Sequence, residues 1–307
     1  MKRIKLLFFL LISIAALSCA VLLPAPPEVF SLRLQRLLTA FLVGGALSLS
    51  GNLTQVLFRN DLATPYTLGV SGGATLGAFL VMISGVGNLV FSVPCGAFSG
   101  AVLAFLLVLV VGRFGRFSST ELLLGGVVVG TVLSGVLIYL VSVANFTEIA
   151  GVNWWMLGDL SSADALGLLL LGISSVVALV VMRLFANDLN AMAFGDEGAA
   201  FLGVSVAVLR LILLGFAALL VSLAVALAGM IGFVGLIVPH IIRKITGSDQ
   251  RYQILPVYLG GGLFLMLCDQ FGRWLDPVRQ LPPGVLTAIF GGALFLTVLY
   301  RRNRGVR

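Results

Sequence analysis

The sequence predicts an all-α polytopic membrane protein with about ten transmembrane helices. Of its 307 residues, 60% are hydrophobic and 10% are charged, and the mean hydropathy is +1.14. A soluble domain carries about 25% charged residues because water must solvate its surface, so lipid must solvate most of this chain. The apolar runs are continuous, whereas strands of a membrane barrel alternate apolar and polar residues. Helices are therefore the predicted spanning elements.

Stretches without Lys, Arg, Asp or Glu supply these helices in order along the chain. Those near the length of one span are residues 6–27, 37–58, 122–147, 165–182 and 280–300. Residues 62–112 suffice for two spans that turn at 85–88. Residues 211–242, interrupted by Gly229, Gly232, Gly235 and Pro239, predict one full and one shorter span. Residues 252–268 complete the set.

The amino terminus has two interpretations. Lys2, Arg3 and Lys5 precede an apolar run that contains Cys19, as in a secretory or lipoprotein signal peptide. The run is longer than the roughly 7–15 residues of a signal. We therefore predict a retained first helix.

The basic residues predict the orientation. If both termini are cytoplasmic, only Arg33, Arg36, Arg273 and Arg279 of the 19 Lys and Arg residues lie outside, as the positive-inside rule requires. The net charge of +7 thus reflects topology, so we expect a lipid bilayer and no nucleic-acid partner. Residues 1–307 form one predicted transmembrane domain, with a long cytoplasmic loop at about 184–209.

An internal similarity predicts an inverted repeat. Residues 46–51 (ALSLSG) resemble residues 224–229 (AVALAG), and each segment follows a basic residue at a helix start. With ten helices, the first of these two runs inward and the second outward. Such repeats place a transport pathway at the interface of the two halves.

Four motifs carry a family resemblance. They are RLQR at 33–36; RNDLATP at 59–65 with LGVSGGA at 68–74; GFVGLIVPHIIR at 232–243; and DQFGR at 269–273 with LPPGVLTA at 281–288. Together they resemble the FecCD/BtuC-type permeases of ABC importers over nearly the whole chain, and the third motif is highly specific. The family usually has Pro where this chain has Gln35, Asp61 and Ala293.

The resemblance implies a permease subunit in the bacterial cytoplasmic (inner) membrane that translocates a ferric siderophore or a related iron, haem or cobalamin complex. It further implies a homodimer, cytoplasmic ATPase subunits, and a periplasmic or lipid-anchored substrate-binding protein. ATP would be used by the partner subunit, and this chain would be no enzyme and bind no cofactor.

The residues themselves agree with a permease whose ATP is bound by another subunit. No Gly-rich phosphate loop is present, since the lysines stand only at 2, 5 and 244. The cysteines lie far apart, and no nucleophile–base pair is visible, so neither a metal site nor an intramembrane enzyme is indicated. Few charges fall within the spans, which disfavours the main alternative, an ion-coupled secondary carrier.

The cytoplasmic loop is the predicted contact with the ATPase. It predicts two short helices hinged at Gly195, with Asp196 and Glu197 at the positive end of the second. Exposed apolar residues on so short an element favour a protein partner over a plain amphipathic linker. The predicted coupling residues are Met192, Phe194, Gly195, Asp196, Glu197, Ala200, Phe201, Leu202 and Gly203.

The predicted pathway or gate residues are Gly69, Ser71, Trp154, Trp155, Pro239 and His240. Gly69 with Gly72, Gly73 and Gly77 forms a small-residue face for close helix packing, which is the simpler reading. The two tryptophans, predicted in an outer loop, suit an interfacial aromatic belt as well as a gate.

Pro239 should end or kink its helix near the inner surface. His240, the only histidine, suits a structural hydrogen bond better than a proton relay or a ligand.

Arg33, Arg36 and Arg273 are the predicted docking site for the binding protein. Their external position opposes the positive-inside bias, and the resemblance places them where the family pairs with acidic residues of that partner. Snorkelling to lipid phosphates, or a local pair of Arg273 with Asp269, is the alternative.

Overall fold

The computed structural model describes residues 27–85, 89–114, 117–276 and 281–304, which form helices joined by short connections. The α-helices are α2 (Pro27–Phe58), α3 (Val70–Ser84), α4 (Leu89–Phe114), α5 (Ser119–Val143), α6 (Phe146–Leu157), α7 (Ala165–Leu184), α8 (Ala186–Ala191), α9 (Gly195–Phe201), α10 (Val206–Ala228), α11 (Val234–Thr246), α12 (Gln250–Leu275) and α13 (Pro283–Arg304). Two 3₁₀ helices, η1 (Pro65–Leu68) and η2 (Met192–Phe194), complete these ranges.

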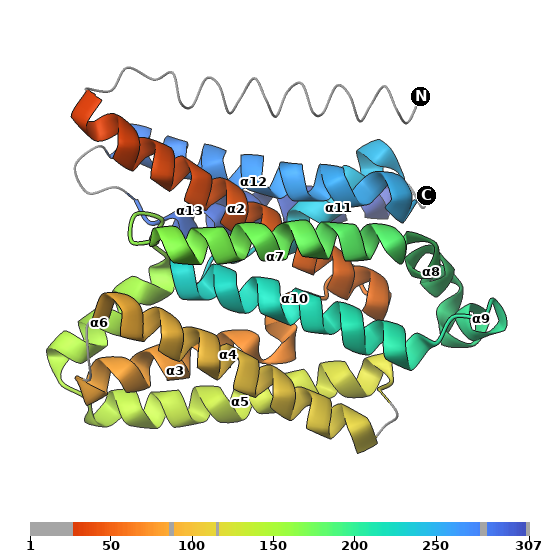
Figure 1. Ribbon diagram of the computed structural model, residues 1–307, viewed down its shortest axis with the longest axis horizontal. Coiled ribbons are helices and arrows are strands. Elements are labelled where there is room, and N and C mark those ends of the chain that lie inside the picture. The colour runs from red at the N-terminus through yellow and green to blue at the C-terminus, as the bar shows by residue number, and fades with distance from the viewer. Residues whose placement is uncertain (1–26, 86–88, 115–116, 277–280, 305–307) are drawn as a thin grey trace.

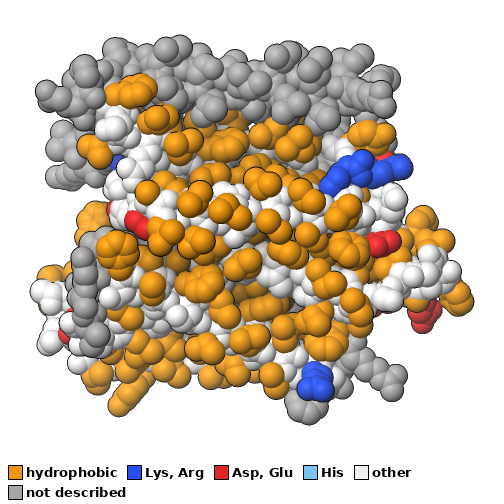
Figure 2. Space-filling view, viewed as in Figure 1, with side chains coloured by type: hydrophobic (Ala, Val, Ile, Leu, Met, Phe, Trp, Pro, Cys, Tyr) orange, Lys and Arg blue, Asp and Glu red, His pale blue; other side chains and the backbone are white. Residues whose placement is uncertain are grey.

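Within the described ranges, six helices are long and apolar enough to cross a membrane: α2, α4, α5, α7, α10 and α12. Hydrophobic side chains cover the middle of the face shown in Figure 2, while charged side chains lie near its edges. The six apolar helices and this surface agree with the predicted multi-pass membrane protein, which is all-helical over the part of the chain that the structure describes. The predicted span at 6–27 lies outside the described residues, so the count of ten and the side of each terminus remain predictions.

Helix α2 is the central element. In the most apolar part of α2, 83% of the residues are buried, whereas in the corresponding part of α5 the share is 17%. Helix α5 is therefore a peripheral helix. Helix α2 packs on α12, α10 and α11, whereas α3 packs on α4 and α5. In Figure 1, α7 and α10 lie between the α2–α12 pair and the α3–α4–α5 group.

The predicted glycine face divides between two neighbours. A Cβ added at Gly73 would lie 2.2 Å from the carbonyl oxygen of Gly100 in α4. Gly77 meets α4 in the same way, whereas Gly72 faces Gly130 of α5 at ordinary contact distances of 3.4 Å and more. At Gly69 a Cβ would lie 3.3 Å from Val129 of α5, and the φ of 74° there itself favours glycine. The α3–α4 contact is therefore the one that requires glycine, because any side chain would push the two backbones apart.

The segment predicted as an outer loop forms helix α6. Helix α5 ends at Val143, and Asn145 begins a capping box in which its backbone N–H donates to the Glu148 carboxylate (2.9 Å). This spacing of Asn and Glu is a helix-start signal. The prediction missed it because the apolar run continues through the break.

The division of residues 211–242 into a full and a short helix is confirmed by α10 and α11. Of the two outcomes predicted at Pro239, the end of the helix is wrong, because α11 continues to Thr246, and the kink stays a prediction. Pro239 cannot donate to the carbonyl of Gly235 four residues earlier. The Gln55 side-chain amide donates to that carbonyl instead (3.3 Å) and to Leu236 O (3.0 Å).

Candidate functional site

Residues 186–203, here called the coupling segment, project beyond the transmembrane helices at one end of the molecule (Figure 1). They form α8, η2 and α9, which confirms the predicted pair of short helices hinged at Gly195. Gly195 has φ 93°, and a Cβ there would lie 2.9 Å from Arg59 Nη1. Both the backbone conformation and the neighbouring guanidinium favour glycine at the hinge.

The segment presents an exposed apolar surface. Phe201 is 91% exposed, Phe194 74% and Leu202 63%. These three side chains are here called the apolar tip: Phe194 directly precedes α9, and Phe201 and Leu202 stand at its last residue and C-cap. Exposed apolar side chains of this size suit contact with a protein. Glu197, Ala200 and Gly203 are also exposed. Met192 is fully buried, so its predicted place on this surface is wrong: its side chain completes the hydrophobic core.

One buried cation attaches α9 to the body of the protein. The Arg210 side chain, in the second turn of α10, is 2% exposed and binds Asp196 through two hydrogen bonds of 2.8 and 2.6 Å. These bonds, with the nearby Arg59, hold the pKa of the Asp196 carboxyl below its ordinary value. The sequence prediction treated Arg210 only as a basic residue at a helix start.

The remaining donors of Arg210 reach three other places. Nε and Nη2 donate to the carbonyl of Leu57 (3.4 and 3.2 Å), in the last turn of α2. Nη1 donates to the carbonyl of Phe117 (3.1 Å), and Nη2 also bonds Ser119 Oγ at the start of α5. A buried charge is stable only with such extensive pairing.

A second attachment joins α8 to α12. Asn190 donates to Asp249 Oδ1 (3.0 Å), and its own oxygen accepts from the Gln250 backbone N–H (2.8 Å). The Gln250 side chain belongs to a closed ring in which Asn52, Gln250 and Gln253 each donate to the next at 2.8, 2.8 and 3.2 Å. This ring ties α12 to α2 within the core.

The predicted pathway residues occupy three separate places. Ser71 lines an open groove of about 370 Å³ between η1–α3 and α5, and the buried Gly69 abuts α5 beside it. Polar side chains edge this groove on both sides, namely Thr67, Ser71, Thr131 and Ser134. Pro239 and His240 belong to α11 and do not line the groove.

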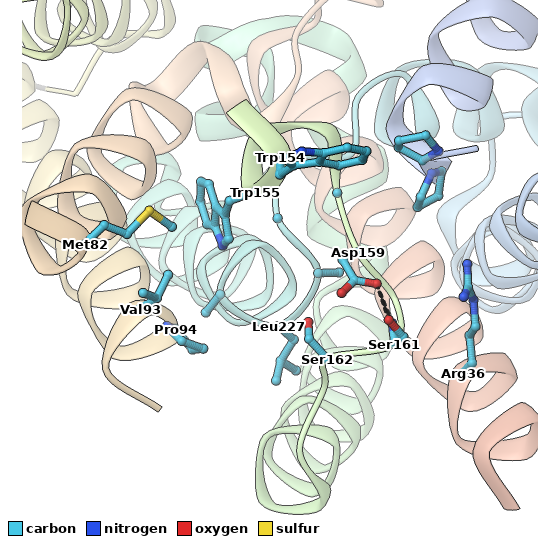
Figure 3. A pocket seen from close by; sticks show the side chains of 16 residues that line it. Arg36, Met82, Val93, Pro94, Trp154, Trp155, Asp159, Ser161, Ser162 and Leu227 are labelled. Atoms are coloured by element: carbon cyan, nitrogen blue, oxygen red, sulfur yellow. Dashed lines mark hydrogen bonds between the residues drawn. The ribbon is translucent and has the colours of Figure 1, made fainter. Parts of the chain in front are cut away.

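The tryptophans line a cavity of about 580 Å³ (Figure 3). Trp154 is 65% exposed, and Trp155 is half-buried. Asp159 and Ser161 contribute polar groups to the same cavity and bond each other, with the Ser161 N–H donating at 2.8 Å. The sequence prediction did not single out these two residues.

Two of the three predicted docking arginines, Arg36 and Arg273, pair with Asp269 on α12. Arg36 Nε and Nη2 donate to Asp269, whose side chain is fully buried, at 3.0 and 2.8 Å. Arg273 contacts the same carboxylate at 3.1 Å, which confirms the local pair considered as the alternative. The pairing of Arg36 with Asp269 was missed because the two residues are 233 positions apart.

Two departures from the family pattern have structural partners here. The Gln35 side chain donates to Ala163 O (2.6 Å), and Asp61 pairs with Arg243 at 2.6 Å. Arg243 also donates to Gln55 Oε1 (3.1 Å), so Asp61 links the α2–η1 connection to α11. Among the described residues, no group of three or more His, Cys, Asp or Glu could hold a metal ion.

Comparison with known proteins assigns the chain to a family and identifies several similar proteins. Residues 3–301 match the FecCD transport family. The hemin transport system permease protein HmuU of Yersinia pestis is 35% identical over 89% of this chain and 83% of its own. The vitamin B12 import system permease protein BtuC of Yersinia enterocolitica is 36% identical over 89% and 82%. A solved structure described as an inward-facing conformation of a metal-chelate type ABC transporter has a TM-score of 0.89 at 25% identity, over 98% of this chain and 99% of that one.

Proposed function

Since the chain belongs to the FecCD transport family, we propose that it is the permease subunit of an ATP-driven importer in a bacterial cytoplasmic membrane. Its substrate is a ferric siderophore, or a related haem or cobalamin complex delivered by a binding protein. The names of the relatives support haem and cobalamin, and the metal-chelate transporter supports an iron complex.

The apolar tip carries this proposal. Three large side chains, Phe194, Phe201 and Leu202, stand exposed in and directly beside α9, a helix of seven residues. An ATPase subunit would cover them and move α9 when it binds and hydrolyses ATP. The nucleotide therefore belongs to the partner, and this chain supplies the pathway.

A homodimer supplies the rest of the pathway. Helix α5 is mostly exposed, and the groove beside it is lined by hydroxyl groups within a chain otherwise adapted to lipid. Polar groups at that depth favour a water-filled passage or a protein interface over lipid. A second copy related by a two-fold axis would place two such grooves on either side of a central channel.

The helix contacts also fit the predicted inverted repeat. Helix α2 packs on α12, and α10 packs on α4; exchanging α2 with α10 and α4 with α12 turns one contact into the other. In the same way, α3 packs on α4 and α11 packs on α12, so exchanging α3 with α11 and α4 with α12 turns the first of these contacts into the second. Such an arrangement places the substrate path where the halves meet.

Uptake into proteoliposomes tests the function. Permease, ATPase subunit and loaded binding protein are reconstituted together, and iron-chelate, haem and cobalamin uptake are measured with ATP inside. We expect uptake that requires ATP and survives an uncoupler of the proton gradient. Uptake that the uncoupler abolishes without need for ATP would instead identify an ion-coupled carrier.

Two changes in the coupling segment test the site. Phe201→Asp places a charge on the apolar tip, and Gly195→Pro forces φ to about −65° where the backbone has 93°. Both variants should insert in the membrane but lose ATP-driven uptake. Wild-type rates in both variants would exclude the coupling segment as the ATPase contact.

The outer arginines are the proposed docking site for the binding protein. Arg36 and Arg273 share the single carboxylate of Asp269, so the three arginines and this acid together keep a formal net charge of +2. Charge reversal at Arg33 should slow association with the binding protein most at low ionic strength, since salt screens such steering. Salt-independent association, equal to wild type, would refute docking at this cluster.

A further inference from the structure

Helix α9 needs a mechanical connection to the transmembrane helices if its movement is to reach the pathway. Its packing contacts are chiefly with η2, α8 and the start of α10. Its one large apolar side chain, Phe201, is 91% exposed, and the residue through which it joins the hydrophobic core is the small Ala199. Apolar packing therefore holds α9 only weakly.

Arg210 provides a strong polar connection instead. Its guanidinium is planar and has five N–H donors in fixed directions, so it binds several acceptors as one rigid unit. On one side it holds the Asp196 carboxylate of α9 through both oxygens. On the other side it holds the Leu57 carbonyl of α2 and the Phe117 carbonyl before α5.

The partners of Arg210 lie at the ends of transmembrane helices, where one side chain can connect α9 to two of them. Leu57 lies in the last turn of α2, where helix carbonyls lack partners within the helix and carry partial negative charge. Ser119 begins α5, the helix that borders the polar groove. A displacement of α9 that carried Asp196 with it would therefore pull on the ends of α2 and α5 together.

We propose that Arg210 is the positioning residue that joins the movement of α9 to α2 and α5, and that it holds α9 through the carboxylate of Asp196. This inference rests on the proposed function for the source of the movement. The anchoring of α9 itself can be measured without transport. Burial of Arg210 makes its removal a risk to folding, so the test changes the half-exposed partner, Asp196.

Asp196→Asn keeps the shape of the side chain and removes its charge, while Asp196→Glu keeps the charge on a longer stem. The matched control is Glu121→Gln, an exposed acid at the same end of the molecule, in the first turn of α5. Glu121 is not one of the groups that Arg210 contacts.

Hydrogen exchange of the permease in lipid nanodiscs gives the first measurement. In Asp196→Asn we expect the amides of Leu202 and Gly203, at the end of α9, to exchange about tenfold faster, the change for loss of one charge-assisted hydrogen bond. Asp196→Glu should recover most of the protection, and Glu121→Gln should match wild type. Equal exchange in Asp196→Asn and Glu121→Gln would overturn the proposal.

The second measurement is the amount of substrate transported per ATP hydrolysed by the reconstituted complex. We expect Asp196→Asn to lower this ratio and Asp196→Glu to restore it. A purely structural role of the Asp196–Arg210 pair would reduce the yield or stability of the complex and leave the ratio unchanged. That result would refute the proposal that Arg210 transmits the movement of α9. Absence of ATP-driven uptake by wild type would overturn the proposed function, while faster exchange in Asp196→Asn would still support Arg210 as the anchor of α9.

Discussion

Gly73→Ala should separate α3 from α4, whereas the same substitution at the neighbouring Gly72 should be tolerated. An alanine Cβ at Gly73 would lie 2.2 Å from Gly100 O and 2.5 Å from the Cβ of Ala104. Ordinary contacts between such atoms begin near 3.5 Å, so the two helices must move apart by about 1 Å. The obstructing atoms cannot rotate away, because one belongs to the backbone and the other is bonded directly to it.

The cost follows from this geometry. Overpacking a tightly packed site costs about 1–3 kcal/mol, and the rigid neighbours place Gly73→Ala at the upper end. The helix propensity of alanine returns up to about 1 kcal/mol, which leaves a net destabilisation of about 2 kcal/mol. At Gly72 the nearest atoms would be 3.4 Å away, so the propensity gain remains and the variant should be neutral or slightly stabilised.

Unfolding in mixed micelles of mild detergent and SDS, followed by circular dichroism, measures the two variants side by side. We expect their unfolding free energies to differ by about 2–3 kcal/mol. Gly215→Ala, where a Cβ would meet nothing within 4 Å, is a further control. Equal stability of the Gly73 and Gly72 variants would refute the argument that the backbone contact requires glycine at position 73.

Three other substitutions test the polar contacts. Gln253→Met opens the amide ring: Asn52 Oδ1 loses its donor, and the Gln250 amide keeps only its 3.4 Å bond to Ser248 O. The unfolding free energy should therefore fall by about 1–3 kcal/mol, and an unchanged thermal midpoint would contradict this. Asp61→Asn removes a half-exposed ion pair with α11 and should cost under about 1 kcal/mol in the same assay. Hydrogen bonding from Arg251 holds the pKa of Asp249 below its ordinary value. The ionised Asp249 carboxylate therefore stabilises the folded protein fully above about pH 4, and this stabilisation is lost only as the pH falls through the lower pKa of the folded state. Asp249→Asn should therefore lower the midpoint equally at about pH 5 and pH 8, and a difference that shrinks between those values would argue against this pairing.

The sequence by itself determined the membrane-spanning helices. Transfer of an apolar run into lipid is favourable residue by residue, so the stretches at 165–182 and 211–242 identify their helices without reference to the rest of the chain. The hinge at Gly195 was also predictable, because a glycine between two short helical patterns is a local signal. The helix α6 could have been found in the same way from the spacing of Asn145 and Glu148.

Only the tertiary structure decided which side chains meet. Gly72 and Gly73 are neighbours of one residue type, yet only at Gly73 is the next backbone too close for a Cβ (2.2 Å to Gly100 O in α4, against 3.4 Å from Gly72 to Gly130 O in α5). Met192 looked exposed on a short loop and is buried by helices distant in the sequence. Arg210 finds its acceptors 153, 93 and 14 residues away, and a single side chain carries no sign of partners so remote. Local patterns report the free energy of one segment in lipid, whereas a buried ion pair or a helix crossing depends on several segments meeting at once.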